Sequence, residues 1–345
     1  MKFNVIGFDN KDEWEKVTLG REVYYQWQYV DAFYRIGDGI PMLAYATDGM
    51  EYVINVFFLR DIGKDLEIDN SEYNYYDITT PYGYGGVDYN GGNEKLLDYF
   101  FCEFTKYCND KRIVSEFLRL CPFTNNYKNY NEDYDILNIS KTVYMKLDNP
   151  EQIWTDLESR CRNTIRKAKT NNLVVKSGFT KEMFKEFIDI YKDTMSRDDA
   201  EDYYFFSDEF FESIYENMKK FAKIYTVYLE DKPISSSIIM FNGISAHYHL
   251  SGTLRDYMKY GANNLGLYEI ALDLCENGCK KFHLGGGYGG DSSPLLKFKR
   301  SFNKFGDLDF YIGKKIYDQS AYDTLCKVRN IKDKTGFFPA YRKEK

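Results

Sequence analysis

The sequence predicts a mixed α/β protein built from two similar domains. Strand-like runs alternate with amphipathic helices along a chain of 345 residues, and the 43% of hydrophobic residues are enough for two cores. Each half contains a hairpin, a further strand and a glycine-rich turn in which Tyr-Gly-Gly precedes an aspartate, at residues 84–88 and 288–291. This repeated order indicates an internal duplication, joined near residues 140–150, with the two halves facing a common cleft.

The elements of the first half follow from local patterns. Bulky residues at helical spacing predict a helix over 24–34, and a helix over 93–109 is expected from a similar apolar stripe. Between them, Asp48-Gly49 separates two β-rich runs, which is typical of a hairpin. The strands expected in this half are 41–46, 52–59 and 76–80.

The second half repeats this arrangement. One long helix over 150–171 is expected to carry an apolar stripe beside a basic stripe. The apolar stripe consists of Ile153, Trp154, Leu157, Cys161, Ile165 and Ala168. The further helices expected are 181–195, 208–221 and 261–277, and the strands are 222–229, 234–241, 244–251 and 281–284.

Composition excludes several classes of protein. No apolar run is long enough to cross a bilayer and the first residues lack a secretory signal, so we expect a cytoplasmic protein, at most peripheral at the inner face of the membrane. Seven cysteines without a CxxC pair indicate reduced thiols. Of three histidines none has metal-ligand spacing, and His247 and His249 alternate on one strand, so no metal is expected. A net charge of −7 argues against general DNA binding.

Positive charge is nevertheless concentrated in the second half. Residues 160–169 carry five Lys and Arg and no acid, and residues 295–345 carry thirteen Lys and Arg against six Asp and Glu. The glycine-rich turn at 284–287 leads into the basic, aromatic segment 296–302. Together these segments predict an anion-binding cleft and a phosphate-bearing substrate.

Three motifs of the second half carry a resemblance to a known family. They are Arg-Asn-Thr-Ile-Arg-Lys-Ala at 162–168, Ala-His-Tyr-His-Leu-Ser-Gly at 246–252 followed by Gly-Ala-Asn-Asn-Leu at 261–265, and Leu-Gly-Gly-Gly at 284–287 followed by Phe-Lys-Arg-Ser-Phe at 298–302. In this order they resemble the FemABX family of peptidoglycan interpeptide-bridge aminoacyltransferases. The resemblance is strongest over residues 150–313.

The resemblance implies two tandem GNAT-like (acyl-CoA N-acyltransferase) domains facing a common cleft. The expected domains are 1–145 and 146–315, with a helical extension over 316–345 that packs back on the first. The implied activity is transfer of an amino acid from aminoacyl-tRNA to the amine of a peptidoglycan precursor stem peptide, lipid-linked or UDP-linked. No cofactor and no metal are implied, and tRNA and the muropeptide precursor are the expected partners.

The resemblance also suggests roles for individual residues. Lys299, after Phe298 in the last motif, corresponds to a family lysine near the transfer centre and is expected to stabilise the oxyanion or a neighbouring phosphate. Arg197 stands where the family has a phosphate-binding arginine, unless the adjacent Asp198 binds it instead. Asp88 matches an acidic residue that would take a proton from the attacking amine, although it could equally be a turn residue.

Further side chains are candidates for substrate contact. Tyr82, Tyr84 and Tyr248 could orient a peptide or a sugar, or could simply pack between strands. Arg35 stands nearest to the place of a family lysine that holds the precursor's diphosphate. The basic stripe could contact the tRNA acceptor stem or form a solvated helix face; it consists of Arg162, Arg166 and Lys169.

Two other functions fit the same sequence. An acyl-CoA-dependent N-acyltransferase would use acetyl-CoA and bind its pyrophosphate at a helix N-terminus through a Gln/Arg-x-x-Gly-x-Gly/Ala loop. Here that loop is Met258-Lys259-Tyr260-Gly261-Ala262-Asn263, which lacks the first residue and the small last one. A non-catalytic muropeptide or tRNA binder would keep Arg197 and the basic stripe but would not need Lys299.

Overall fold

The computed structural model describes residues 1–68, 74–89, 91–197, 201–287 and 293–343. It divides into two compact units, unit 1 with residues 1–139 and 310–345 and unit 2 with residues 140–309. The boundaries expected at 145/146 and 315/316 fall inside β6 (Asp135–Lys146) and β12 (Asp307–Ile316), the two strands in which the chain passes from one unit to the other. The second Tyr-Gly-Gly-Asp turn and Asp198 lie outside the described residues.

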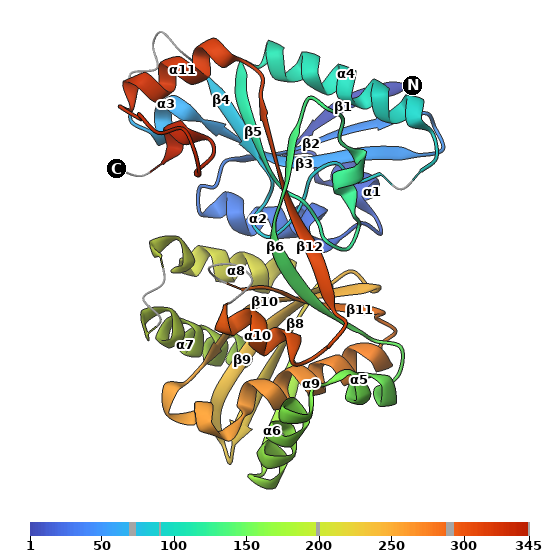
Figure 1. Ribbon diagram of the computed structural model, residues 1–345, viewed down its shortest axis with the longest axis vertical. Helices are drawn as coiled ribbons and strands as arrows, with labels where there is room; N and C mark the ends of the chain where they lie inside the picture. The colour runs from blue at the N-terminus through green and yellow to red at the C-terminus, as the bar shows by residue number, and fades with distance from the viewer. Residues whose placement is uncertain (69–73, 90, 198–200, 288–292, 344–345) are drawn as a thin grey trace. The chain divides into compact units, whose positions relative to one another are not determined.

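Unit 1 is a sheet with the strand order β1-β2-β3-β4-β5-β12 (Figure 1). Only β4 and β5 run parallel among its recorded pairs, and the hairpin predicted around Asp48-Gly49 is β2–β3. Its strands are β1 (Lys2–Gly7), β2 (Ile40–Thr47), β3 (Tyr52–Asp61), β4 (Tyr76–Thr79), β5 (Ile113–Arg119) and the end of β12. Its helices are α1 (Lys11–Thr18), η1 (Val23–Tyr25), α2 (Trp27–Arg35), α3 (Ile62–Asp65), α4 (Glu94–Asp110), η2 (Asn126–Asn129), α11 (Gln319–Val328) and η5 (Ala340–Arg342).

The C-terminal segment is held in unit 1 by apolar and ionic contacts. Tyr322 and Tyr341 join a buried cluster with Ile62 of α3 and Val114 of β5. Asp77 of β4 is completely buried, and its two carboxylate oxygens accept from Arg342 and from Arg60. Residues 340–342 therefore form an integral part of this unit.

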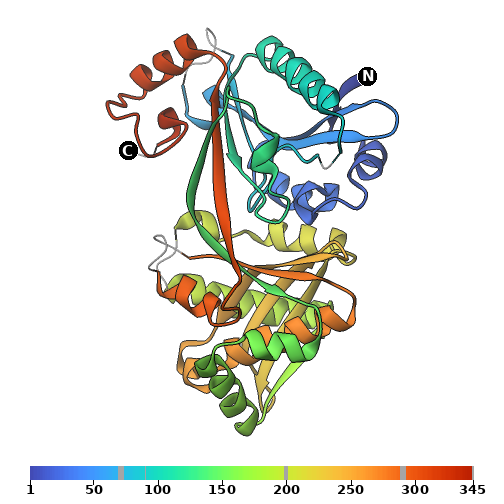
Figure 2. The ribbon, with the colours of Figure 1, turned by 45° about the vertical axis from the view of Figure 1, so that its right-hand side comes forward.

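Unit 2 repeats the topology of unit 1 with the strand order β7-β8-β9-β10-β11-β6. Figure 2 shows the sheet of this unit, in green to orange, with helices packed on it. Its strands are β7 (Leu173–Gly178), β8 (Ala222–Leu229), β9 (Lys232–Phe241), β10 (Ser245–Thr253), β11 (Lys281–Gly286) and the end of β6. Its helices are α5 (Pro150–Asp156), α6 (Ser159–Thr170), α7 (Lys181–Arg197), η3 (Asp202–Tyr204), α8 (Asp208–Asn217), η4 (Arg255–Tyr260), α9 (Ala262–Glu276) and α10 (Pro294–Arg300). In each unit a helix, α4 or α9, connects the two parallel strands, which supports the inferred duplication.

One predicted helix of unit 2 is in fact two. The chain breaks at Leu157 and Glu158, which are extended between α5 and α6. The Arg162 guanidinium turns back and donates to the carbonyl oxygens of Trp154, Thr155 and Leu157, while the Glu158 amide donates to Ser301 O. These hydrogen bonds satisfy the backbone groups that lose their helical partners at the break. The sequence gives no sign of the break, because no proline or glycine occurs there. The predicted apolar stripe still packs in one core with α9.

The described residues bear on three predictions made from composition. No helix among them is long and apolar enough to span a membrane. All seven cysteines are free thiols, and most are buried, as expected. The described part of the chain contains no group of three His, Cys, Asp or Glu side chains placed to hold a metal ion.

Candidate active site

The candidate site of unit 2 lies where two parallel strands separate. β10 and β11 pair only over three positions, ending at His247 opposite His283, and β11 then continues with β6 on its other side. A cavity of about 580 Å³ lies at this opening. Ligands of open α/β sheets commonly bind at such a fork beyond the carboxyl ends of parallel strands.

A β-bulge determines which side chains of β10 face the cavity. Tyr248 pairs with Ile239 and Leu250 with Ile238, so His249 is an extra residue on β10. The extra residue shifts the alternation, and Ser251 and Thr253 come to line the same cavity as Tyr248. The regular alternation predicted for His247 and His249 is therefore interrupted at His249.

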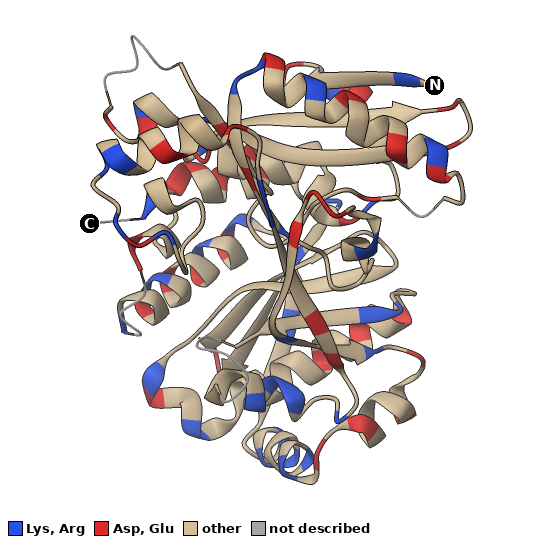
Figure 3. Ribbon diagram, turned by 45° about the horizontal axis from the view of Figure 1, so that its top comes forward, with Lys and Arg blue, Asp and Glu red and all other residues tan. Residues whose placement is uncertain are grey.

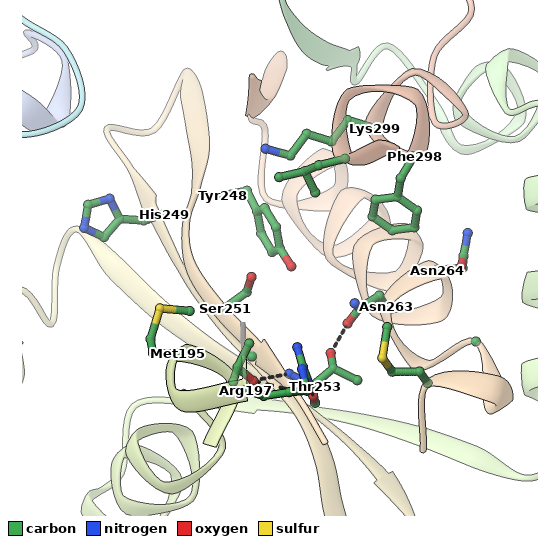
Figure 4. A pocket seen from close by; sticks show the side chains of 15 residues that line it. Met195, Arg197, Tyr248, His249, Ser251, Thr253, Asn263, Asn264, Phe298 and Lys299 are labelled. Atoms are coloured by element: carbon green, nitrogen blue, oxygen red, sulfur yellow. Dashed lines mark hydrogen bonds between the residues drawn. The ribbon is translucent and has the colours of Figure 1, made fainter. Parts of the chain in front are cut away.

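Lys299 enters this cavity from α10 and is almost fully buried, with 8% of its surface exposed. The Lys299 side chain points into the cavity (Figure 4), and its Nζ donates to Gly286 O, at the end of β11, over 2.6 Å. Burial lowers its pKa from an ordinary 10.5 to about 8. Gly285 has a φ of +79°, which favours glycine, and a Cβ at that position would lie only 3.2 Å from Lys299 Nζ. The absence of a side chain at Gly285 therefore leaves room for the lysine amine.

The opposite wall of the cavity is the start of α9. Asn263 Oδ1 accepts from the hydroxyl groups of Thr253 and Ser235, at 2.5 and 2.8 Å. Because both donors bind the oxygen, the amide NH₂ of Asn263 turns toward the cavity (Figure 4). The preceding Gly261 adopts a left-handed φ of +73° against Thr164 of α6, so α9 begins close to α6.

Most of the remaining lining groups are aromatic, apolar or cationic. Phe298 points from α10 into the cavity, and the hydroxyl group of Tyr248 points toward its middle (Figure 4). Arg197, at the end of α7, donates to Thr253 O over 2.6 Å. Burial lowers the pKa of His249 to about 3, so this imidazole is neutral at neutral pH. The structure thus brings four predicted residues, Lys299, Phe298, Tyr248 and Arg197, to one cavity.

Comparisons with known proteins agree with this geometry. Residues 157–300 match the acetyltransferase (GNAT) domain family. The crystal structure of FemX superposes with a TM-score of 0.69 and 14% identity, covering 94% of this chain and 99% of that one. The chain therefore has the fold of FemX, and the GNAT match falls on its second unit. The predicted fold class, two GNAT-like domains, is therefore confirmed, and so is the prediction of an acyltransferase.

Two other solved structures are also similar to this fold. The C-terminal domain of a putative lysylphosphatidylglycerol synthetase from Agrobacterium fabrum has a TM-score of 0.60 and 11% identity, covering 93% of this chain and 96% of that one. L-PGS from Bacillus licheniformis has a TM-score of 0.52 and 13% identity, covering 84% and 89%. No curated protein sequence matches the chain.

The candidate residues of the first GNAT unit are engaged in local contacts. Asp88 is 2% exposed, its carboxylate pairs with Arg21 at 2.9 Å, and its backbone pairs with Ile54. Burial raises the pKa of Asp88, although Arg21 opposes that shift. Arg35 pairs with Asp31 on the same helix at 3.0 Å. For Asp88, a role as base requires that the carboxylate first becomes accessible.

The two tyrosines of this unit lie against other aromatic rings. Tyr82 stacks on Phe33 with centroids 5.5 Å apart, and Tyr84 meets Tyr24 edge to face. Burial raises the pKa of Tyr84 well above its ordinary value, so its hydroxyl group stays protonated. The Gly83 between them is pressed against the Tyr24 ring. Packing thus accounts for the position of both tyrosines in unit 1.

The predicted basic stripe of α6 is also engaged within unit 2. Arg162 is bonded to the carbonyl groups at the end of α5, as described above. Arg166 donates to Asn163 Oδ1 and lies over the Trp154 ring. Lys169 pairs with Glu269 of α9 at 2.8 Å. Each of the three therefore has a partner inside its own unit.

Proposed function

We propose that the protein transfers an amino acid from aminoacyl-tRNA to the amine of a peptidoglycan precursor stem peptide. The observation that carries this proposal is the buried Lys299 at the fork of β10 and β11, inside a GNAT unit of a chain that has the FemX fold. A buried ammonium group beside a backbone carbonyl is suited to charge that develops on a reacting ester. The same cavity offers neutral hydroxyl and amide groups that can orient the ester.

The proposed step is aminolysis of an ester. The acceptor nitrogen attacks the ester carbon and a C–N bond forms. The C–O bond to the ribose then breaks, the nitrogen loses a proton, and the ribose oxygen takes one up and leaves as a hydroxyl group. Lys299 can stabilise the oxyanion and donate the proton to the leaving oxygen, and the proton lost by the nitrogen restores its charge. Its pKa of about 8 keeps it mostly charged at neutral pH, yet able to exchange a proton near that pH. Holding the two reactants together supplies much of the rate.

Aminoacyl-tRNA is favoured over acetyl-CoA by the start of α9. A pyrophosphate that binds at a helix N-terminus needs close approach to the backbone amides. The Asn263 side chain stands at this point, fixed by two hydroxyl groups, where an acyl-CoA enzyme keeps a small residue. The match to the acetyltransferase domain family favours acetyl-CoA, which remains the second candidate donor.

The test compares donors and acceptors directly. The purified chain is incubated with a mixture of charged tRNAs or with acetyl-CoA, together with UDP-linked or lipid-linked muropeptide, and products are analysed by mass spectrometry. The proposal predicts a mass gain of one amino acid on the muropeptide, and only with charged tRNA. An acetyl gain from acetyl-CoA would establish the alternative. Aminoacylation of phosphatidylglycerol, included as a competing acceptor, would refute the proposed acceptor.

A further inference from the structure

A second cavity adjoins the first in unit 2. It has a volume of about 770 Å³ and lies between the first turns of α6, the start of α9 and α10. Asn264 and Phe298 line both cavities, so the two meet at these side chains. A ligand whose reactive end lies at Lys299 can therefore extend past Phe298 into the second cavity.

The second cavity is lined by more cations than anions. Arg160, Lys297 and Arg300 line it, and Glu158 is its one carboxylate among the residues that the structure describes there. Arg300 is neutralised by Asp307, which it contacts at 2.8 and 2.9 Å. Lys and Arg are concentrated on α6 and α10 around it (Figure 3).

Two of these cations differ from the rest of the basic cluster. Within the described parts of the chain, Arg160 and Lys297 form no hydrogen bond or ion pair through their side chains, and both are exposed. The rest of the lining is uncharged apart from Arg300, which Asp307 neutralises, and Glu158, whose single carboxylate offsets one of these two cations. Asn264 donates to Cys161 Sγ at 3.4 Å, and Thr164 donates to Arg160 O. The N-terminus of α6 carries no side-chain cap, so the positive end of its dipole adds to the same field.

We propose that Arg160 and Lys297 bind a phosphate group of the nucleotide that carries the acyl group. This inference rests on the proposed function, since it takes Lys299 as the position of the reacting ester. Guanidinium and ammonium groups are the side chains that bind phosphate most strongly. The 3′ end of tRNA and coenzyme A both end in an adenosine nucleotide with phosphate, so the shared chemistry is an adenosine nucleotide phosphate.

The test measures binding without chemistry. Uncharged tRNA and coenzyme A are titrated separately against the full chain at several salt concentrations, with the wild type and with the double variant Arg160→Ala/Lys297→Ala. Lys167→Ala is the control, because Lys167 is an exposed cation of α6 that lines neither cavity. Each lost contact is expected to weaken binding about tenfold. For tRNA, the slope of log K against log salt should become shallower by about 0.7, because the pair neutralises one phosphate of a single strand.

Each outcome decides the inference. Loss of tRNA affinity in the double variant alone supports the site with tRNA as its ligand, and the same loss for coenzyme A supports it with coenzyme A. Unchanged affinity and slope for both ligands, or a wild type that binds neither, would overturn it. A further donor, an aminoacyl-adenosine without phosphate, should be used equally well by wild type and double variant. Failure of transfer from every charged tRNA, with binding still dependent on the pair, would refute the proposed function but not the phosphate site.

Discussion

Replacing Lys299 with Met should remove transfer and at the same time stabilise the fold. Burial lowers the lysine pKa from 10.5 to about 8, so the buried charge destabilises the fold by about 3 kcal/mol below pH 8. Met keeps the volume but gives up the hydrogen bond to Gly286 O, worth about 1 kcal/mol. The net expectation at pH 7 is a free energy of unfolding about 2 kcal/mol higher than that of the wild type.

The sign of this effect fixes its pH dependence. The unfolded chain keeps the lysine protonated up to about pH 10.5, whereas the folded chain releases the proton near pH 8, so the wild type regains stability as pH rises between these values. Urea unfolding at pH 7 and at pH 10 should therefore show the advantage of Met at the lower pH and its loss at the higher one. Transfer should fall about 10²–10³-fold. A variant that is less stable at pH 7, or that transfers normally, would refute the reasoning.

Three other substitutions test neighbouring features. Gly285→Ala should lower the free energy of unfolding by about 1–2 kcal/mol because of the positive φ, and should impair transfer because the new Cβ displaces Lys299. The control is Gly243→Ala, where φ is +95° and no atom lies within 4 Å of the added Cβ, so only stability should be lost. Equal transfer in both variants would contradict this. Asn263→Asp keeps an oxygen that accepts from both hydroxyl groups, so the urea midpoint of unfolding should not fall. Its negative charge should raise the KM for the donor about tenfold, and an unchanged KM would count against the donor site. Asp77→Asn should cost about 3–5 kcal/mol by leaving two half-buried arginines without their buried carboxylate. Burial alone would raise the pKa of the Asp77 carboxyl group, but the two arginines hold it below its ordinary value. The wild type should therefore lose this stability only as pH falls below about 4. Acid unfolding of wild type and variant measures the difference in stability between them.

Regular periodicity and turn chemistry predicted most elements of unit 2 but missed β1, β5 and β12 of unit 1. The Asp48-Gly49 hairpin is present as β2–β3, and the apolar stripe from Ile153 to Ala168 is buried as expected. The break between α5 and α6 could not be predicted, because it is stabilised by Arg162, a residue several positions further along, rather than by a local breaker. The bulge at His249 escaped prediction for a similar reason, since only pairing with β9 reveals it.

The site was predicted only as far as its motifs reached. Lys299, Phe298, Tyr248 and Arg197 do line one cavity, but they were selected by resemblance rather than by physical reasoning. Charge counting identified α6 correctly as a basic helix, yet it could not separate the cations that bind their own unit from Arg160, which does not. That distinction depends on neighbours such as Glu269, more than 90 residues away along the chain.

A crystal structure with an unreactive donor tests the central claim most directly. The ligand is an aminoacyl-adenosine in which an amide nitrogen replaces the ester oxygen, so that transfer cannot occur. The account predicts that its acyl carbonyl oxygen lies about 3 Å from Lys299 Nζ, at the fork of β10 and β11, with the adenosine beside Phe298 and Asn264. An acyl group bound away from Lys299, or an adenosine bound in unit 1, would contradict it.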